Sequence, residues 1–84
     1  MRLDKEAIFE VVKANVLKVL PDLVPDEVKV DRSLTELGAN SVDRVEVVMY
    51  SLEDLELNVP TARLHGLRNL AELVDLLYRH QASG

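Results

Sequence analysis

Residues 38–56 have the sequence GANSVDRVEVVMYSLEDLE. This stretch begins with a glycine and with polar residues typical of a helix start, and a segment rich in apolar residues follows. Asn40 is a strong N-cap candidate, and Asp43 occupies the third helical position after it. The helical pattern continues to the end of the segment, and Pro60 follows to terminate it. We therefore predict a helix that begins at Ser41.

The apolar side chains of this helix cover a face that is wide for a single buried stripe. At ~100° per residue they spread over roughly 140°. The members of this arc are Val42, Val45, Val48, Met49, Leu52 and Leu55, with Val47 outside it. One side of the arc must be exposed, and the acids that border that side are Glu46, Glu53 and Glu56. These acids are either solvated charges beside core residues or an acidic docking ridge for basic proteins.

Ser41 lies where the predicted helix has free backbone N–H groups and the positive end of its dipole. An attached phosphate is favoured at such a position. A serine there is also compatible with a simple helix start that shares capping with Asn40. Position alone leaves both interpretations open.

Two further long helices are predicted. One runs from Asp4 to Leu20 with its apolar residues on one face, and Pro21 ends it. The other is capped by Asn69, with Glu72 three residues later as in a capping box. We expect residues 81–84 to fray at its end.

The connections carry shorter signals. Val28 and Val30 are expected to tuck inward from the long connection after the first helix. Residues 33–36, Ser-Leu-Thr-Glu, have the pattern of a capping box on a brief turn that Gly38 ends. Residues 61–65 can form one or two helical turns. Together these elements predict an all-α fold, a small four-helix bundle of three main helices and one short helix.

Composition and charge limit the function further. The chain has 84 residues, no cysteine and a net charge of −5, with 15 acidic and 10 basic residues. This length fits one domain over residues 1–84, and no cysteine-based site can exist. The acidic field should repel nucleic acid and attract basic protein surfaces. The charged N-terminus lacks the apolar region of a signal peptide, and no apolar run could span a bilayer, so we expect a cytoplasmic monomer with no membrane association.

The motifs around Ser41 carry a family resemblance. They are Leu37-Gly38-Ala39-Asn40-Ser41-Val42-Asp43, then Val45-Glu46, Val48-Met49 and Val59-Pro60. In this order and spacing they resemble the acyl carrier proteins of fatty-acid and polyketide synthesis, and the likeness covers nearly the whole chain. It implies the acyl carrier protein type of bundle, with a long helix, a long loop, a modified helix, a short helix and a final helix.

The resemblance also implies a function. Ser41 would receive 4′-phosphopantetheine from a phosphopantetheinyl transferase that uses coenzyme A, and the thiol of this arm would carry the acyl group. The protein would then be a carrier and not an enzyme, with an acyltransferase and a ketosynthase or HMG-synthase-like enzyme as partners. The docking residues implied are Val42, Asp43, Arg44, Val45, Glu46, Met49 and Glu53.

Two residues depart from the usual family pattern. Asn40 stands where the family usually has Asp, and Arg44 stands where most relatives carry a small or uncharged residue. The strings 40–44 and 52–55 resemble the stand-alone carriers of polyketide β-branching cassettes, which deliver acetyl to an HMG-synthase-like enzyme. The chain ends soon after its last helix, which favours a discrete carrier. The alternative to this subgroup is a general elongation carrier. The alternative role for Arg44 is an ordinary surface pair with a nearby acid such as Asp54.

Three other interpretations compete with a carrier. A nucleophilic triad needs a serine, a histidine and an acid, and the candidates are Ser41, Asp43 and either His65 or His80. The chain has no Gly-x-Ser-x-Gly motif, however, and is small for an oxyanion pocket. An unmodified helical module would instead dock through the acidic ridge. A metal site is not expected, because no loop has EF-hand spacing.

Overall fold

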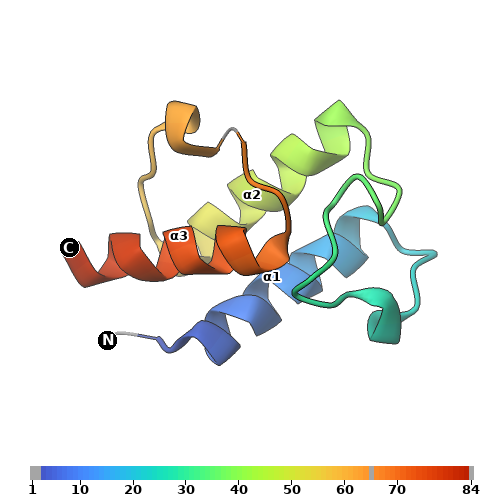
Figure 1. Cartoon of the computed structure of the whole chain (residues 1–84), viewed down its shortest axis with the longest axis horizontal. Helices are drawn as coiled ribbons and strands as arrows, with labels where there is room; N and C mark the ends of the chain where they lie inside the picture. Colours follow the sequence, from blue (N-terminus) through green and yellow to red (C-terminus); the bar gives the residue numbers. More distant parts are fainter. Residues whose placement is uncertain (1–2, 65, 84) are drawn as a thin grey trace.

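The computed structural model describes residues 3–64 and 66–83. Three α-helices make up most of it (Figure 1): α1 (Lys5–Val19), α2 (Ser41–Leu55) and α3 (Leu70–Ser83). Two 3-10 turns lie in the connections: η1 (Pro25–Glu27) and η2 (Thr61–Leu64). No strand occurs in these described residues, so the predicted all-α fold is confirmed. The predicted short helix is the turn η2, and its expected last residue, His65, lies outside the described residues.

Local capping signals set the helix boundaries. Asp4 caps α1, because its Oδ1 accepts a hydrogen bond from Ala7 N at 2.8 Å. Asn69 caps α3 as predicted, and its Oδ1 accepts from Glu72 N at 3.0 Å. The Glu72 carboxylate does not return to Asn69 but accepts from Arg68 N at 3.0 Å. Asn69 therefore makes the expected capping hydrogen bond, whereas the Glu72 carboxylate binds the backbone N–H one residue earlier than expected.

Helix α1 packs against both α2 and α3. In Figure 1 the two chain ends lie on one side of the molecule, and the start of α2 lies at the opposite end. The buried apolar core consists of Ile8, Val12, Val16, Val28, Leu37, Val47, Val59, Leu70, Leu73, Val74, Leu76 and Leu77. No helix within the described ranges is both long and apolar enough to cross a membrane.

The face of α2 that meets α1 differs from the predicted arc. That arc leaves out Val47, yet the Val47 side chain is fully buried. Ser51 lies one turn farther along the same face and hydrogen-bonds Asn15 of α1, so this is the face that packs against α1. The prediction was wrong because α2 has two neighbours. It packs against α1 on this side, and on the side of Val48 it faces Leu64 and residues 66–73 across a groove.

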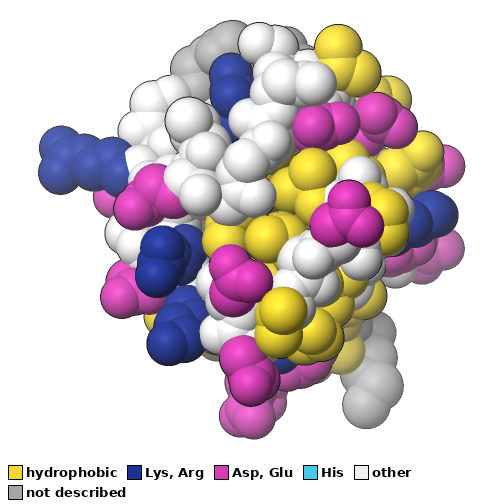
Figure 2. Space-filling model, turned by 90° about the vertical axis from the view of Figure 1, so that its right-hand side faces the viewer, with side chains coloured by type: hydrophobic (Ala, Val, Ile, Leu, Met, Phe, Trp, Pro, Cys, Tyr) yellow, Lys and Arg dark blue, Asp and Glu magenta, His cyan; other side chains and the backbone are white. Residues whose placement is uncertain are grey.

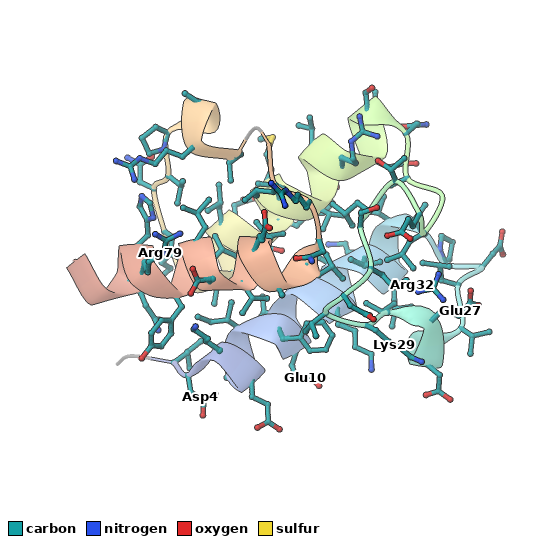
Figure 3. The ribbon with its side chains drawn as sticks, in the orientation of Figure 1. Asp4, Glu10, Glu27, Lys29, Arg32 and Arg79 are labelled. Carbon is teal, nitrogen blue, oxygen red and sulfur yellow. The ribbon has the colours of Figure 1, made fainter. Side chains whose placement is uncertain are left out.

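The long connection that carries Arg32 (Figure 3) is tied to the start of α3. Leu70 N donates to Arg32 O at 2.9 Å, and Ala71 N donates to Val30 O at 2.8 Å. These bonds satisfy backbone donors that a helix start leaves free. Val28 is buried as predicted, but Val30 is 46% exposed. The expectation for Val30 was wrong because its backbone, and not its side chain, makes the contact with α3.

The end of α3 contradicts the predicted fraying. The helix continues to Ser83. Leu3 N donates to Gln81 Oε1 at 3.1 Å, and Gln81 Nε2 donates back to Leu3 O. This pair joins the two ends of the described chain, a long-range contact that no local pattern reveals. Gly84 lies outside the described residues.

Candidate functional site

A capped turn delivers the chain to the start of α2. Glu36 N donates to Ser33 Oγ at 3.0 Å, and Ser33 N donates to Glu36 Oε1 at 2.9 Å, which is the predicted capping box. The hydrogen bond from Ser33 N is the main cause that lowers the pKa of Glu36 below its ordinary value, and the Ser33 hydroxyl and the Arg32 charge act in the same direction. The turn is thus held by a carboxylate that stays ionised at neutral pH.

Gly38 reverses the chain immediately before the helix. Its φ of +97° lies in the left-handed region, and a Cβ there would meet no atom within 4 Å, so the backbone angle alone favours glycine. Gly38 N donates to Thr35 O at 3.0 Å, and Ala39 N donates to Leu34 O at 3.0 Å. This is the hydrogen-bond pattern of a Schellman motif. It places the buried Ala39 against the core and leaves the next residues at the surface.

Asn40 and Asp43 start α2 with the predicted capping box. Asp43 N donates to Asn40 Oδ1 at 2.8 Å, and Asn40 N donates to Asp43 Oδ2 at 3.2 Å. The box leaves Ser41 as the first residue of the helix, with an exposed side chain. The Ser41 side chain is therefore accessible from the surface.

Arg44 reaches back over this helix start. Its Nη2 donates to Ser41 Oγ at 3.4 Å, and its Nη1 donates to Ala39 O at 3.2 Å and to Thr35 Oγ1 at 3.3 Å. The alternative in which Arg44 pairs with Asp54 is wrong. Asp54 Oδ2 accepts a hydrogen bond from Asn15 Nδ2 at 3.0 Å instead. Arg44 therefore belongs to the surroundings of Ser41.

A groove of ≈ 590 Å³ opens beside Ser41 between α2 and the segment from η2 to the first turn of α3. Its apolar lining comes from Leu34, Val45, Val48, Met49, Leu52, Leu64, Leu67, Leu70 and Leu73. Its polar lining comes from Ser33, Thr35, Ser41, Arg44, Arg68 and Asn69. The sequence did not single out Thr35 as a site residue, because its place in the groove depends on how the connection packs against α2.

An apolar strip on α2 is exposed beside the groove. Val42, Val45 and Met49 are 65%, 56% and 56% exposed, as the wide predicted arc required. Glu53 is exposed, whereas Glu46 is half-buried and accepts a hydrogen bond from Tyr50 OH at 3.3 Å. Figure 2 shows the end of the molecule at which α2 begins, where hydrophobic side chains gather among acidic ones. The strip and its acids form a surface that suits an apolar, basic partner.

Among the described residues, the candidate triad of Ser41, Asp43 and His80 shows no hydrogen bond between the serine and the histidine. His80 Nδ1 lies 3.1 Å from Leu76 O, one turn back along α3. His65 lies outside the described residues. The hydroxyl of Ser41 is paired with Arg44, which cannot act as a general base at neutral pH. The described part of the chain also holds no group of three or more acidic or histidine side chains suited to a metal ion.

The chain matches a protein family described as the phosphopantetheine attachment site over residues 10–77. It belongs to the acyl carrier proteins. Members of this family carry covalently attached 4′-phosphopantetheine. The match spans most of α1, the whole of α2 and the groove.

Individual relatives agree with this assignment. The chain is 45% identical to the polyketide biosynthesis acyl-carrier-protein AcpK of Bacillus subtilis (strain 168), over 90% of this chain and 93% of that one. It is 35% identical to an acyl carrier protein of Campylobacter fetus subsp. fetus (strain 82-40), over 84% of this chain and 92% of that one. Its structure also resembles a chain in the crystal structure of the curacin biosynthetic pathway HMG synthase in complex with its acetyl donor acyl carrier protein. The TM-score is 0.84 at 35% identity, over 92% of this chain and 99% of that one.

Proposed function

We propose that this carrier protein holds an acyl group on a 4′-phosphopantetheine arm attached to Ser41. The observation that carries the proposal is the exposed Ser41 hydroxyl at the first position of α2, beside the groove. The backbone N–H groups of Ser41 and Val42 have no intrahelical partner, so this position suits a phosphodiester. When attached, the arm supplies a thiol that holds the acyl group as a thioester.

Attachment breaks the pyrophosphate (phosphoanhydride) bond of coenzyme A and forms a phosphate ester bond to Ser41. The Ser41 oxygen forms a bond to the phosphorus that bears the pantetheine group of coenzyme A. The bond between that phosphorus and the bridging pyrophosphate oxygen breaks, and adenosine 3′,5′-bisphosphate leaves. The serine proton passes to a base of the transferase, because among the described residues the side chain that hydrogen-bonds Ser41 Oγ is Arg44, which is not a base at neutral pH. The carrier presents the nucleophile, and the transferase supplies the catalysis.

The pathway we propose is polyketide biosynthesis, with acetyl donation to an HMG-synthase-like enzyme. The Bacillus relative is named for polyketide biosynthesis, and the similar solved chain was crystallised with an HMG synthase. The second candidate is a general elongation carrier. The Campylobacter relative, named simply as an acyl carrier protein, favours that alternative.

The surface proposed for partner docking is the exposed strip of α2. Val42, Val45 and Met49 offer apolar contact area, and Glu53 offers a free carboxylate beside it. Asp43 and Arg44 are engaged in hydrogen bonds around the helix start. Their contribution to docking would therefore be to hold Ser41 in place while a partner approaches.

Intact-mass measurement tests the carrier function. Protein co-expressed with a phosphopantetheinyl transferase should gain the mass of one arm, and Ser41→Ala should gain nothing. Ser33→Ala is the matched control, because Ser33 also lines the groove but is not at the helix start. Wild-type protein that never gains the arm would rule out the proposal.

Transfer assays test the acetyl-donor role. We expect acetyl-loaded protein to acylate an HMG-synthase-like enzyme of a β-branching pathway much faster than an elongation ketosynthase. Equal rates with both enzymes would remove the donor assignment and leave the general elongation carrier.

A further inference from the structure

The hydrogen bonds that Arg44 makes are long, and their acceptors are neutral. The three donor–acceptor distances are 3.2, 3.3 and 3.4 Å, and the acceptors are the carbonyl of Ala39 and the hydroxyls of Thr35 and Ser41. N–H···O bonds are usually about 2.9–3.0 Å long. A guanidinium binds anionic oxygens more tightly and often through two parallel bonds. The described surroundings of Arg44 therefore leave it able to bind an anion.

The groove beside Arg44 has the opposite charge to the molecule as a whole. The chain carries a net charge of −5, yet the described lining of the groove contains Arg44 and Arg68 and no Asp or Glu. Within the described residues, the Arg68 guanidinium has neither an ion pair nor a hydrogen bond. The described lining of this groove in an acidic protein thus holds two cations and no carboxylate.

The acid nearest in sequence to Ser41 does not neutralise Arg44. The Asp43 carboxylate accepts a hydrogen bond from Asn40 N at 3.2 Å as part of the capping box. The residue before Ser41, Asn40, is uncharged. Among the described residues, the cation that contacts the Ser41 hydroxyl is the Arg44 guanidinium, 3.4 Å from Oγ.

We propose that Arg44 binds the phosphodiester of the arm attached to Ser41 and holds the start of the arm at the mouth of the groove. This inference rests on the proposed function, because it requires the arm. Ser41 Oγ becomes the ester oxygen on attachment, and the two non-bridging oxygens of the phosphate lie one bond beyond the phosphorus. A guanidinium that already contacts Oγ can reach them with little movement. Arg44 then exchanges long bonds to neutral atoms for charge-assisted bonds to the phosphate.

Nuclear magnetic resonance of the arm-bearing protein tests this proposal. The variants are Arg44→Gln, Arg44→Lys and the control Arg63→Gln, which removes the same charge from an exposed position that does not line the groove. Attachment of the arm is first verified by mass, so a failure to load concerns the proposed function and not this inference. The measurements are the phosphorus chemical shift, the phosphorus line width and the nitrogen and proton resonances of the Arg44 guanidinium.

We expect the guanidinium resonances of Arg44 to move between the apo and arm-bearing wild-type proteins. The phosphorus signal of Arg44→Gln should shift and become narrower, because the phosphate loses its bound cation and gains mobility. The phosphorus signal of Arg44→Lys should lie between those of wild type and Arg44→Gln, since lysine keeps the charge without the planar guanidinium. The phosphorus signal of Arg63→Gln should match that of wild type.

Identical phosphorus signals in wild type and Arg44→Gln would overturn the proposal. If circular dichroism shows that Arg44→Gln does not fold, the comparison of wild-type protein with and without the arm decides. Guanidinium resonances that are the same with and without the arm would show that Arg44 does not bind the phosphate.

Discussion

Asn15 of α1 donates a hydrogen bond to Ser51 of α2 inside the core, with 3.2 Å between Nδ2 and Oγ. Both side chains are buried among aliphatic residues. Asn15 Nδ2 also donates to Asp54 Oδ2 at 3.0 Å, and Ser51 Oγ donates to Val47 O at 2.8 Å. This polar connection fixes the register of α1 against the helix that carries Ser41, because sliding either helix would leave buried polar atoms without partners.

Replacing Asn15 tests how much this connection contributes to stability. We expect Asn15→Ala to lower the free energy of unfolding by about 1–3 kcal/mol, because it removes a buried hydrogen-bonding group. Asp54→Ala is the control, and it should cost less because Asp54 is exposed and water can replace it. Urea denaturation measures both. Equal costs would mean that the buried bond to Ser51 adds nothing.

The two sides of α2 should respond differently to the same substitution. Val47 is fully buried, whereas Val45 is 56% exposed. We expect Val47→Ala to lower the free energy of unfolding by about 1–3 kcal/mol, and Val45→Ala to change it by less than about 0.5 kcal/mol. Thermal denaturation of the pair checks this. In the binding of a partner enzyme, Val45→Ala should have the larger effect, since Val45 lies on the exposed strip and Val47 does not.

Gly38 is predicted to be sensitive to any side chain. Its φ of +97° is unfavourable for L-residues, and a methyl group at this position would meet open space, so the backbone angle alone causes the cost. We expect Gly38→Ala to lower the free energy of unfolding by about 1–2 kcal/mol. Chemical denaturation measures the loss. Gly38→Asn is the comparison and should be tolerated better, because asparagine enters this region more readily.

Charge reversal on α2 should weaken the docking of a basic partner. We expect Glu53→Lys to raise the Kd for an HMG-synthase-like enzyme by about 3–10-fold at low salt and by less at high salt. Glu10→Lys makes the same charge change on α1, where Figure 3 shows Glu10 projecting away from α2. Titration calorimetry at two ionic strengths measures the effect. Equal losses in the two variants would indicate a response to net charge instead of a docking surface.

The ion pair between α1 and α3 predicts a pH dependence. Lys5 Nζ lies 2.9 Å from Asp75 Oδ1, and this hydrogen bond is the main cause that lowers the pKa of Asp75 below its ordinary value of 3.8. Because the folded pKa is the lower one, the pair stabilises the fold above pH 3.8 and loses this effect as the pH falls through the folded pKa.

Lys5→Met should raise the pKa of Asp75 toward 3.8, though not fully, since Arg79 Nε remains 3.1 Å from Asp75 Oδ2. A carbon-detected pH titration of the Asp75 carboxyl measures this shift. Lys29→Met removes the same charge from the long connection (Figure 3) and should leave the pKa of Asp75 unchanged. An unchanged Asp75 in Lys5→Met would contradict the ion pair.

Much of the helix start that carries Ser41 could be predicted from the sequence. The capping pairs Ser33 with Glu36 and Asn40 with Asp43 are both present, and Gly38 adopts the left-handed angle expected of a glycine that ends a turn. These features join residues a few positions apart, so the hydrogen bonds that create them are encoded where they occur.

Tertiary structure decided the features that depend on residues far apart in the chain. The burial of Val47, the outward side chain of Val30 and the bond between Leu3 and Gln81 all differ from the local patterns. Each depends on which element packs alongside, and a period of apolar residues does not say how many neighbours a helix has. The sequence alone therefore determined the capped helix that presents Ser41. Only packing decided that Arg44 would meet Ser41 at the mouth of a groove without acids, because that groove exists only once α2, η2 and the start of α3 are brought together.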